Sequence, residues 1–139
     1  MIFVDTWAWV ALADRRDPYH APATAQHQQF QINRRPYCTT DDVLGEVITY
    51  LYDALPVVQA QAFVQALLNA GEKGTHQIIH ISPEQFRKAW ELRKKYHDKP
   101  DISFVDFTSF VVMRDLGITE VFTGDAHFQQ VGMGFRLVP

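Results

Sequence analysis

Cysteine is nearly absent from this sequence: Cys38 is the only one among 139 residues, so no disulfide can form within the chain. A protein without disulfides suits a reducing compartment. Cys38 stands in the run 37–40 without the pattern of a catalytic cysteine, so we expect a small, buried apolar residue. The core needs no covalent cross-links, because a domain of this length buries roughly 70% of its unfolded surface.

Long apolar stretches are missing as well. The longest unbroken run, residues 7–13, is far too short to span a bilayer. The apolar start, residues 1–4, has no basic residue before it and meets Asp5 at once, unlike a secretory signal. We therefore expect a cytoplasmic protein with no membrane segment.

Positive charge is not in excess either. Thirteen Lys and Arg residues stand against sixteen Asp and Glu residues, which gives a formal net charge of -3. This balance argues against a protein that holds nucleic acid on a broad basic surface. It leaves open a nuclease that contacts phosphate through metal ions and a local basic patch. The ordinary composition and the length predict one globular domain, residues 1–139.

Short apolar segments alternate with amphipathic ones along the chain, which predicts an α/β protein with a parallel sheet covered on both faces. The expected strands are residues 2–4, 37–39, 76–81, 119–123 and 135–138. The expected helices are residues 7–13, 21–32, 41–55, 57–70, 83–96 and 103–116, with Thr6 as a cap of the first and Gly71 as the stop of the fourth. Sheets of this kind bind ligands beyond the carboxyl ends of their strands.

Two acidic residues follow strands at corresponding positions. Asp5 comes directly after the first strand, and Asp125 follows the fourth strand after Gly124. If these strands are neighbours, both carboxylates meet at the same edge of the sheet. Each aspartate alone is as typical of a turn or a helix cap as it is of a functional site. The pair favours a functional site.

Two further acids lie on helices. Glu46 borders an apolar stripe, as surface glutamates often do, but Gly45 beside it costs a helix about 1 kcal/mol, which a closely approaching backbone or ligand would explain. Asp106 lies in a nearly apolar helix, three residues after Ser103. It either caps that helix together with Ser103 or carries a buried charge that needs a partner.

A common cation is the most economical partner for these four acids. Two like charges about 4 Å apart repel by about 4 kcal/mol at an effective dielectric constant of 20. Four such groups therefore take up protons or bind divalent cations, and oxygen ligands select Mg²⁺ or Mn²⁺. Such ions bind phosphodiesters and lower the pKa of water. The residues thus predict metal-dependent phosphodiester hydrolysis.

Four segments in this order resemble the PIN-domain ribonucleases, above all the VapC-type toxins of bacterial toxin–antitoxin pairs. They are residues 2–6 (Ile-Phe-Val-Asp-Thr), 45–47 (Gly-Glu-Val), 103–106 (Ser-Phe-Val-Asp) and 123–128 (Thr-Gly-Asp-Ala-His-Phe). The resemblance implies a Mg²⁺- or Mn²⁺-dependent endoribonuclease on a three-layer α/β/α sandwich with a central, mainly parallel sheet. It also implies an RNA substrate, a cognate antitoxin and a homodimer.

The resemblance assigns roles to individual residues. The catalytic, metal-binding quartet corresponds to Asp5, Glu46, Asp106 and Asp125. Supporting positions around it are the hydroxyls of Thr6, Ser103 and Thr123 and a further carboxylate at Asp101. From its own position, two residues after Asp125, His127 either contacts phosphate or packs at a helix start.

Other functions remain open at this point. The alternatives to the leading hypothesis of a toxin are a housekeeping PIN-type nuclease that processes RNA and a non-catalytic module whose acidic pocket binds an arginine of a partner. A haloacid-dehalogenase-like phosphotransferase is disfavoured, because the run from Asp5 to Trp7 lacks a second acid. A receiver domain is disfavoured because Ser82 and Pro83 follow the third strand.

Several basic residues and histidines carry weaker expectations. We expect His76 and His80, in the segment of the third strand, to face solvent. Arg34 and Arg35, and the charged face of the helix at 83–96, are expected to be solvated or to attract RNA. The residues of that helix face are Arg87, Lys88, Arg93, Lys94 and Lys95.

Overall fold

A five-stranded sheet forms the centre of the computed structural model, which describes residues 1–139. All strands are parallel, in the order β3-β2-β1-β4-β5, so the mainly parallel sheet that we expected is parallel throughout. The strands are β1 (Ile2–Val4), β2 (Tyr37–Thr40), β3 (His76–Ile79), β4 (Glu120–Phe122) and β5 (Arg136–Val138). In the centre, Val4 is paired with Phe122, so the residues after β1 and β4 meet at one edge.

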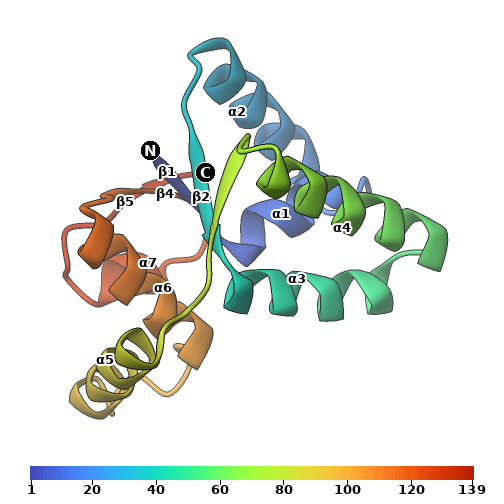
Figure 1. The fold of residues 1–139 in the computed structure, drawn as a ribbon. Helices are drawn as coiled ribbons and strands as arrows, with labels where there is room; N and C mark the ends of the chain where they lie inside the picture. Colours follow the sequence, from blue (N-terminus) through green and yellow to red (C-terminus); the bar gives the residue numbers. More distant parts are fainter.

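Helices cover both faces of this sheet, which confirms the three-layer α/β/α sandwich. Four helices lie on one side in Figure 1: α1 (Thr6–Ala13), α2 (His20–Ile32), α3 (Asp41–Ala54) and α4 (Val57–Glu72). On the other side lie α5 (Pro83–Lys95), α6 (Phe104–Leu116) and the short α7 (His127–Gln130). None of these helices has the length and apolar character that a membrane crossing requires.

Aromatic side chains fill much of the core between sheet and helices. The rings of Phe110 and Phe128 meet edge to face with their centroids 4.9 Å apart, an arrangement that aromatic pairs favour. Trp9 and Phe30 belong to the same core. Cys38 is fully buried, as expected of a small apolar residue, and burial raises the pKa of its thiol to about 11.

Local chemistry explains where the helices begin. Thr40 caps α3 by accepting a hydrogen bond from the Val43 N–H, at 3.0 Å. Ser82 and Ser103 each open a helix with a reciprocal capping box, in which side chain and backbone three residues apart satisfy each other's donors. These caps place the first turns of α3 and α6 beyond the carboxyl ends of the strands.

The structure corrects several expectations from the sequence. Helix α4 does not end at Gly71 but continues to Glu72. Glycine stands at position 71 because a Cβ atom there would collide with the side chain of Ile78. The chain turns instead at Gly74, whose φ of 77° suits glycine. Strand β3 ends at Ile79 rather than at residue 81, and α7 was expected only as a possible helix start at His127. Thr6 does not cap α1, whose N-cap is Asp5 without a side-chain bond.

Candidate active site

Asp5 and Thr123 stand side by side at the ends of the two central strands. The Thr123 hydroxyl donates a hydrogen bond to Asp5 Oδ2 at 2.9 Å and accepts one from the Asp125 N–H at 3.0 Å. Asp5 is only 3% exposed and Thr123 is fully buried. One threonine therefore fixes the acid after β1 and the acid after β4 relative to each other.

Asp106 reaches the same edge of the sheet from the first turn of α6. Its N–H donates to Ser103 Oγ at 3.1 Å, and its Oδ2 accepts from the Ser103 N–H at 3.2 Å. The same Oδ2 lies 2.9 Å from His127 Nδ1. Both interpretations that the sequence left open for Asp106 are therefore correct, because this residue caps its helix and also belongs to an acidic cluster.

Asp125 and His127 complete this cluster. The His127 N–H donates to Asp125 Oδ1 at 2.9 Å, and the imidazole Nδ1 lies 3.2 Å from Asp125 Oδ2. Ligand atoms of Asp106, Asp125 and His127 lie within 4.8 Å of one another, a spacing that can hold a metal ion. His127 does begin α7, as one expectation had it, but its ring contacts the two acids.

Glu46 joins the site through Thr6 instead of through the other acids. The Thr6 hydroxyl donates to Glu46 Oε1 at 2.7 Å, which links the start of α1 to the second turn of α3. Glu46 is half-buried, and Oε2 has no protein partner. No atom lies within 4 Å of a Cβ built on Gly45, so no close backbone explains that glycine.

The cluster concentrates negative charge in a poorly solvated place. Burial, reinforced by the charges of Asp106 and Asp125, raises the pKa of Asp5 to about 7, although the Thr123 hydrogen bond opposes the shift. Burial also raises the pKa of Asp106, against the effect of the hydrogen bond from His127. No lysine or arginine forms an ion pair with any of the four acids. The donor set therefore fits a hard divalent cation.

Two of the supporting residues differ in what they do. Ser103 caps α6 and holds Asp106 by two hydrogen bonds, so it acts through its neighbour. Asp101 is exposed in the turn before α6 and makes no hydrogen bond or ion pair, so the structure does not bring it into the cluster. A spacing pattern alone cannot distinguish these two positions.

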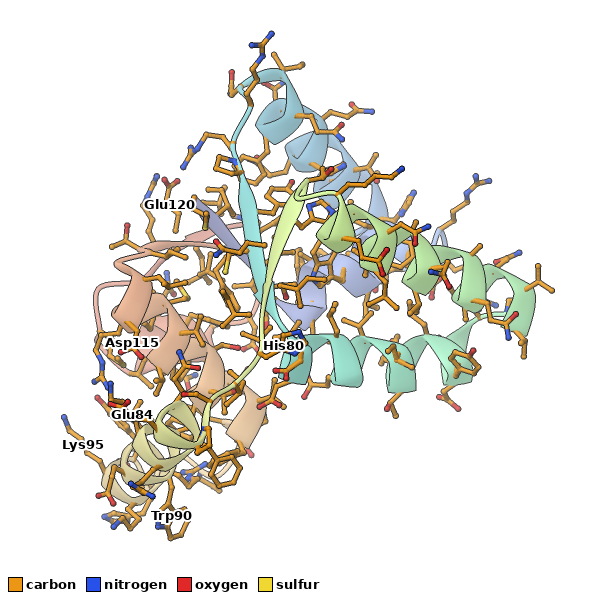
Figure 2. All side chains as sticks on the ribbon, in the orientation of Figure 1. His80, Glu84, Trp90, Lys95, Asp115 and Glu120 are labelled. Carbon is orange, nitrogen blue, oxygen red and sulfur yellow. The ribbon has the colours of Figure 1, made fainter.

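The basic face of α5 is largely neutralised by its own surroundings. The Arg93 guanidinium lies 4.7 Å from the centre of the Phe107 ring and donates to three backbone carbonyls, including that of Ile102, so it stabilises the fold. Lys88 and Lys94 pair with acidic neighbours. Figure 2 shows Trp90 and Lys95 at the outer side of this helix, where they remain exposed.

Other basic residues and histidines lie away from the cluster or have structural roles. Arg35 forms an ion pair of 2.6 Å with Glu120, which lies at the beginning of β4, and this arginine holds the pKa of the carboxyl below its usual range. His80 faces solvent beside Asp41, as expected. The expectation for His76 was wrong: its ring stacks on Tyr37, with centroids 5.6 Å apart, and burial lowers its pKa.

Fold and site together define a PIN domain. Residues 2–133 match the PIN domain family, and the chain belongs to it. Within this family, the 23S rRNA-specific endonuclease VapC20 of Mycobacterium tuberculosis is 33% identical over 133 residues, which are 95% of each chain. The resemblance to VapC-type proteins that the four motifs indicated is thereby confirmed.

Solved structures of related proteins agree with this assignment. The crystal structure of Mycobacterium tuberculosis VapC20, called a sarcin–ricin loop cleaving toxin, matches with a TM-score of 0.80 and 32% identity over 95% of both chains. A DNA-bound VapBC structure from Salmonella typhimurium matches with a TM-score of 0.70, covering 99% of this chain and 98% of that one. At 16% identity this second match concerns the fold alone.

Proposed function

We propose that this chain is a divalent-metal-dependent endoribonuclease that acts as the toxin of a toxin–antitoxin pair. Membership of the PIN family and the similarity to VapC20 support the nuclease class. The observation that carries the metal is the gathering of Asp5, Asp106 and Asp125 with no lysine or arginine to balance them. Such a cluster is stable in its charged form only with a cation.

The site residues divide the work of an RNA hydrolysis. Asp5, Asp106 and Asp125 would hold Mg²⁺ or Mn²⁺, which when bound supplies Lewis acidity toward the phosphodiester and lowers the pKa of a water molecule. The Thr123 hydroxyl holds Asp5 and Asp125 in fixed positions relative to each other, because it donates to the first and accepts from the N–H of the second. Thr6 fixes one oxygen of Glu46 and leaves Oε2 free to accept a hydrogen bond from the attacking water. A water molecule that gives its proton to Glu46 would then attack the phosphorus in line, and the RNA oxygen that leaves would take up a proton from solvent, so no covalent enzyme intermediate forms.

The relatives also guide the choice of substrate and partners. Because VapC20 is named for its action on 23S rRNA, ribosomal RNA is the first substrate to test with this chain. Antitoxin binding at the acidic cluster and a homodimeric state are part of the same proposal. An antitoxin that places a positively charged side chain at this cluster would compete with the metal for the carboxylates.

The decisive experiment compares two aspartates near the start of α6. Ribosomal RNA is incubated with Mg²⁺ and with the wild-type protein, Asp106→Asn or Asp101→Asn. We expect Asp106→Asn to lower the cleavage rate by about 100-fold or more. Loss of a residue that only supports a metal ligand costs about 10- to 100-fold, and loss of the ligand itself should cost more. Asp101→Asn, which alters an exposed residue outside the cluster, is the matched control and keeps full activity.

Chelation tests the metal separately. We expect EDTA to stop cleavage and added Mg²⁺ or Mn²⁺ to restore it. Cleavage that survives complete chelation, or an Asp106→Asn protein as active as the wild type, contradicts the proposal.

A further inference from the structure

His127 brings an imidazole nitrogen into an otherwise carboxylate cluster. We propose that His127 Nδ1 is itself a ligand of the divalent cation, which gives the site a mixed nitrogen and oxygen donor set. The inference rests on the proposed function, because it concerns the ion that the same site holds. It adds a ligand to the three aspartates and predicts which ion the site prefers.

The distances at Nδ1 suit a shared ion. This atom lies 2.9 Å from Asp106 Oδ2 and 3.2 Å from Asp125 Oδ2. Neighbouring ligands of an octahedral ion with bonds of about 2.1 Å are about 3 Å apart. The nitrogen therefore lies as far from each of the two oxygens as adjacent corners of one coordination shell, and all three groups have ligand atoms within 4.8 Å of one another.

The backbone around His127 holds these atoms in place. The His127 N–H occupies Asp125 Oδ1 at 2.9 Å, which leaves Oδ2 on the side of the imidazole. The Asp125 N–H is in turn held by Thr123 at 3.0 Å. A segment of five residues thus fixes one carboxylate oxygen and one nitrogen beside each other, without any contribution from a flexible surface side chain.

A hydrogen bond alone accounts for only part of this arrangement. A neutral imidazole with its hydrogen on Nδ1 has one hydrogen to share between two carboxylate oxygens, at 2.9 Å and 3.2 Å from this nitrogen. The other tautomer, with the hydrogen on Nε2, presents a lone pair at Nδ1. A lone pair between two carboxylate oxygens is stabilised by a cation common to all three atoms.

Nitrogen ligation has a consequence for ion choice. Magnesium prefers oxygen ligands, whereas imidazole suits transition-metal ions, and Mn²⁺ accepts both kinds of donor. We therefore expect Mn²⁺ to bind this site more tightly than Mg²⁺, with a preference that depends on His127.

Pulsed EPR of the metal-stripped protein loaded with Mn²⁺ tests the ligand directly. We expect a ¹⁴N coupling typical of a coordinated imidazole in the wild type and in His97→Ala, a control that removes an exposed histidine elsewhere. The coupling should vanish in His127→Asn, whose side-chain amide keeps a hydrogen-bond donor near the place of Nδ1. Because the wild-type spectrum is informative alone, the test does not depend on any variant folding. A wild-type spectrum without nitrogen coupling overturns the inference.

Calorimetric titrations with Mn²⁺ and Mg²⁺ give a second readout. We expect His127→Asn to lower Mn²⁺ affinity by about tenfold or more and Mg²⁺ affinity much less. Equal losses for both ions mean that His127 only orients the carboxylates, and they refute direct ligation. Ion binding without a nitrogen signal refutes this inference alone, whereas metal-independent RNA cleavage refutes the proposed function as well.

Discussion

Replacing Asp5 by asparagine should stabilise the metal-free protein, by an amount that grows with pH. The folded-state pKa of Asp5 is about 7 against 3.8 for a free aspartate. Between these values the unfolded chain releases its proton while the folded protein retains it. Rising pH therefore favours the unfolded chain: the stability present below pH 4 is lost as the pH rises to 7 and above.

The size of the effect follows from the same two pKa values. One pKa unit corresponds to about 1.4 kcal/mol, so the raised pKa of Asp5 lowers the free energy of unfolding by about 4 kcal/mol at pH 8 and by about 1.5 kcal/mol at pH 5, where only the unfolded chain has released the proton. Asparagine has no proton to lose and keeps an oxygen that accepts the hydrogen bond from Thr123. The advantage of Asp5→Asn over the wild type should thus increase by roughly 2.5 kcal/mol between pH 5 and pH 8.

Urea unfolding in EDTA at both pH values measures this difference. Asp101→Asn serves as the control, because it removes the same charge from an exposed position, and its stability should follow the wild type at both pH values. Saturating Mg²⁺ should narrow the gap, since a ligand at 100 times its Kd stabilises the wild type by about 2.7 kcal/mol. If the difference between Asp5→Asn and the wild type is the same at pH 5 and pH 8, the carboxylate is not buried in the way that we describe.

Three other substitutions test separate contacts. Thr123→Val removes the hydroxyl that joins two acids, and we expect a loss of about 1–3 kcal/mol in unfolding free energy together with weaker Mg²⁺ binding in calorimetry. Gly124→Ala places a Cβ atom 2.5 Å from the Trp7 ring, and thermal unfolding should show a loss of about 1–3 kcal/mol; an unchanged melting temperature means that the indole moves away without cost. Arg93→Ala removes a donor from three carbonyls and leaves that of Ile102 without a protein partner, so it should cost about 2 kcal/mol in urea unfolding. The exposed Lys95→Ala should stay within about 0.5 kcal/mol of the wild type. Equal effects of these last two variants contradict the structural role of Arg93.

The sequence predicted the parts of the site that depend on strand ends and helix caps. Asp5 and Asp125 could be placed together because parallel neighbouring strands end at the same edge, and the structure pairs β1 with β4. Asp106 could be placed because a serine three residues before an acid is a capping signal. The metal-binding roles of these residues stay predictions.

Contacts between distant side chains could not be predicted in this way. The hydrogen bond from Thr6 to Glu46 spans 40 residues and depends on how α1 packs against α3, which no local pattern encodes. The sequence pattern indicates a helix stop at Gly71, whereas the structure shows a glycine required by the close approach of the Ile78 side chain, a tertiary contact that no local pattern encodes. Arg93 likewise looked like part of a charged surface until its carbonyl partners were known.

The hydrogen bond from Thr123 to Asp5, which connects the ends of β4 and β1, has a consequence for folding during protein synthesis. It joins positions 118 residues apart, so the three clustered aspartates cannot assemble until β4 has docked against β1. A nascent chain that has not yet been extended past β4, or one truncated before it, lacks Asp125 and holds at most part of the acidic cluster. For an enzyme that cleaves RNA, this delays catalytic competence until β4 and the residues that follow it have left the ribosome.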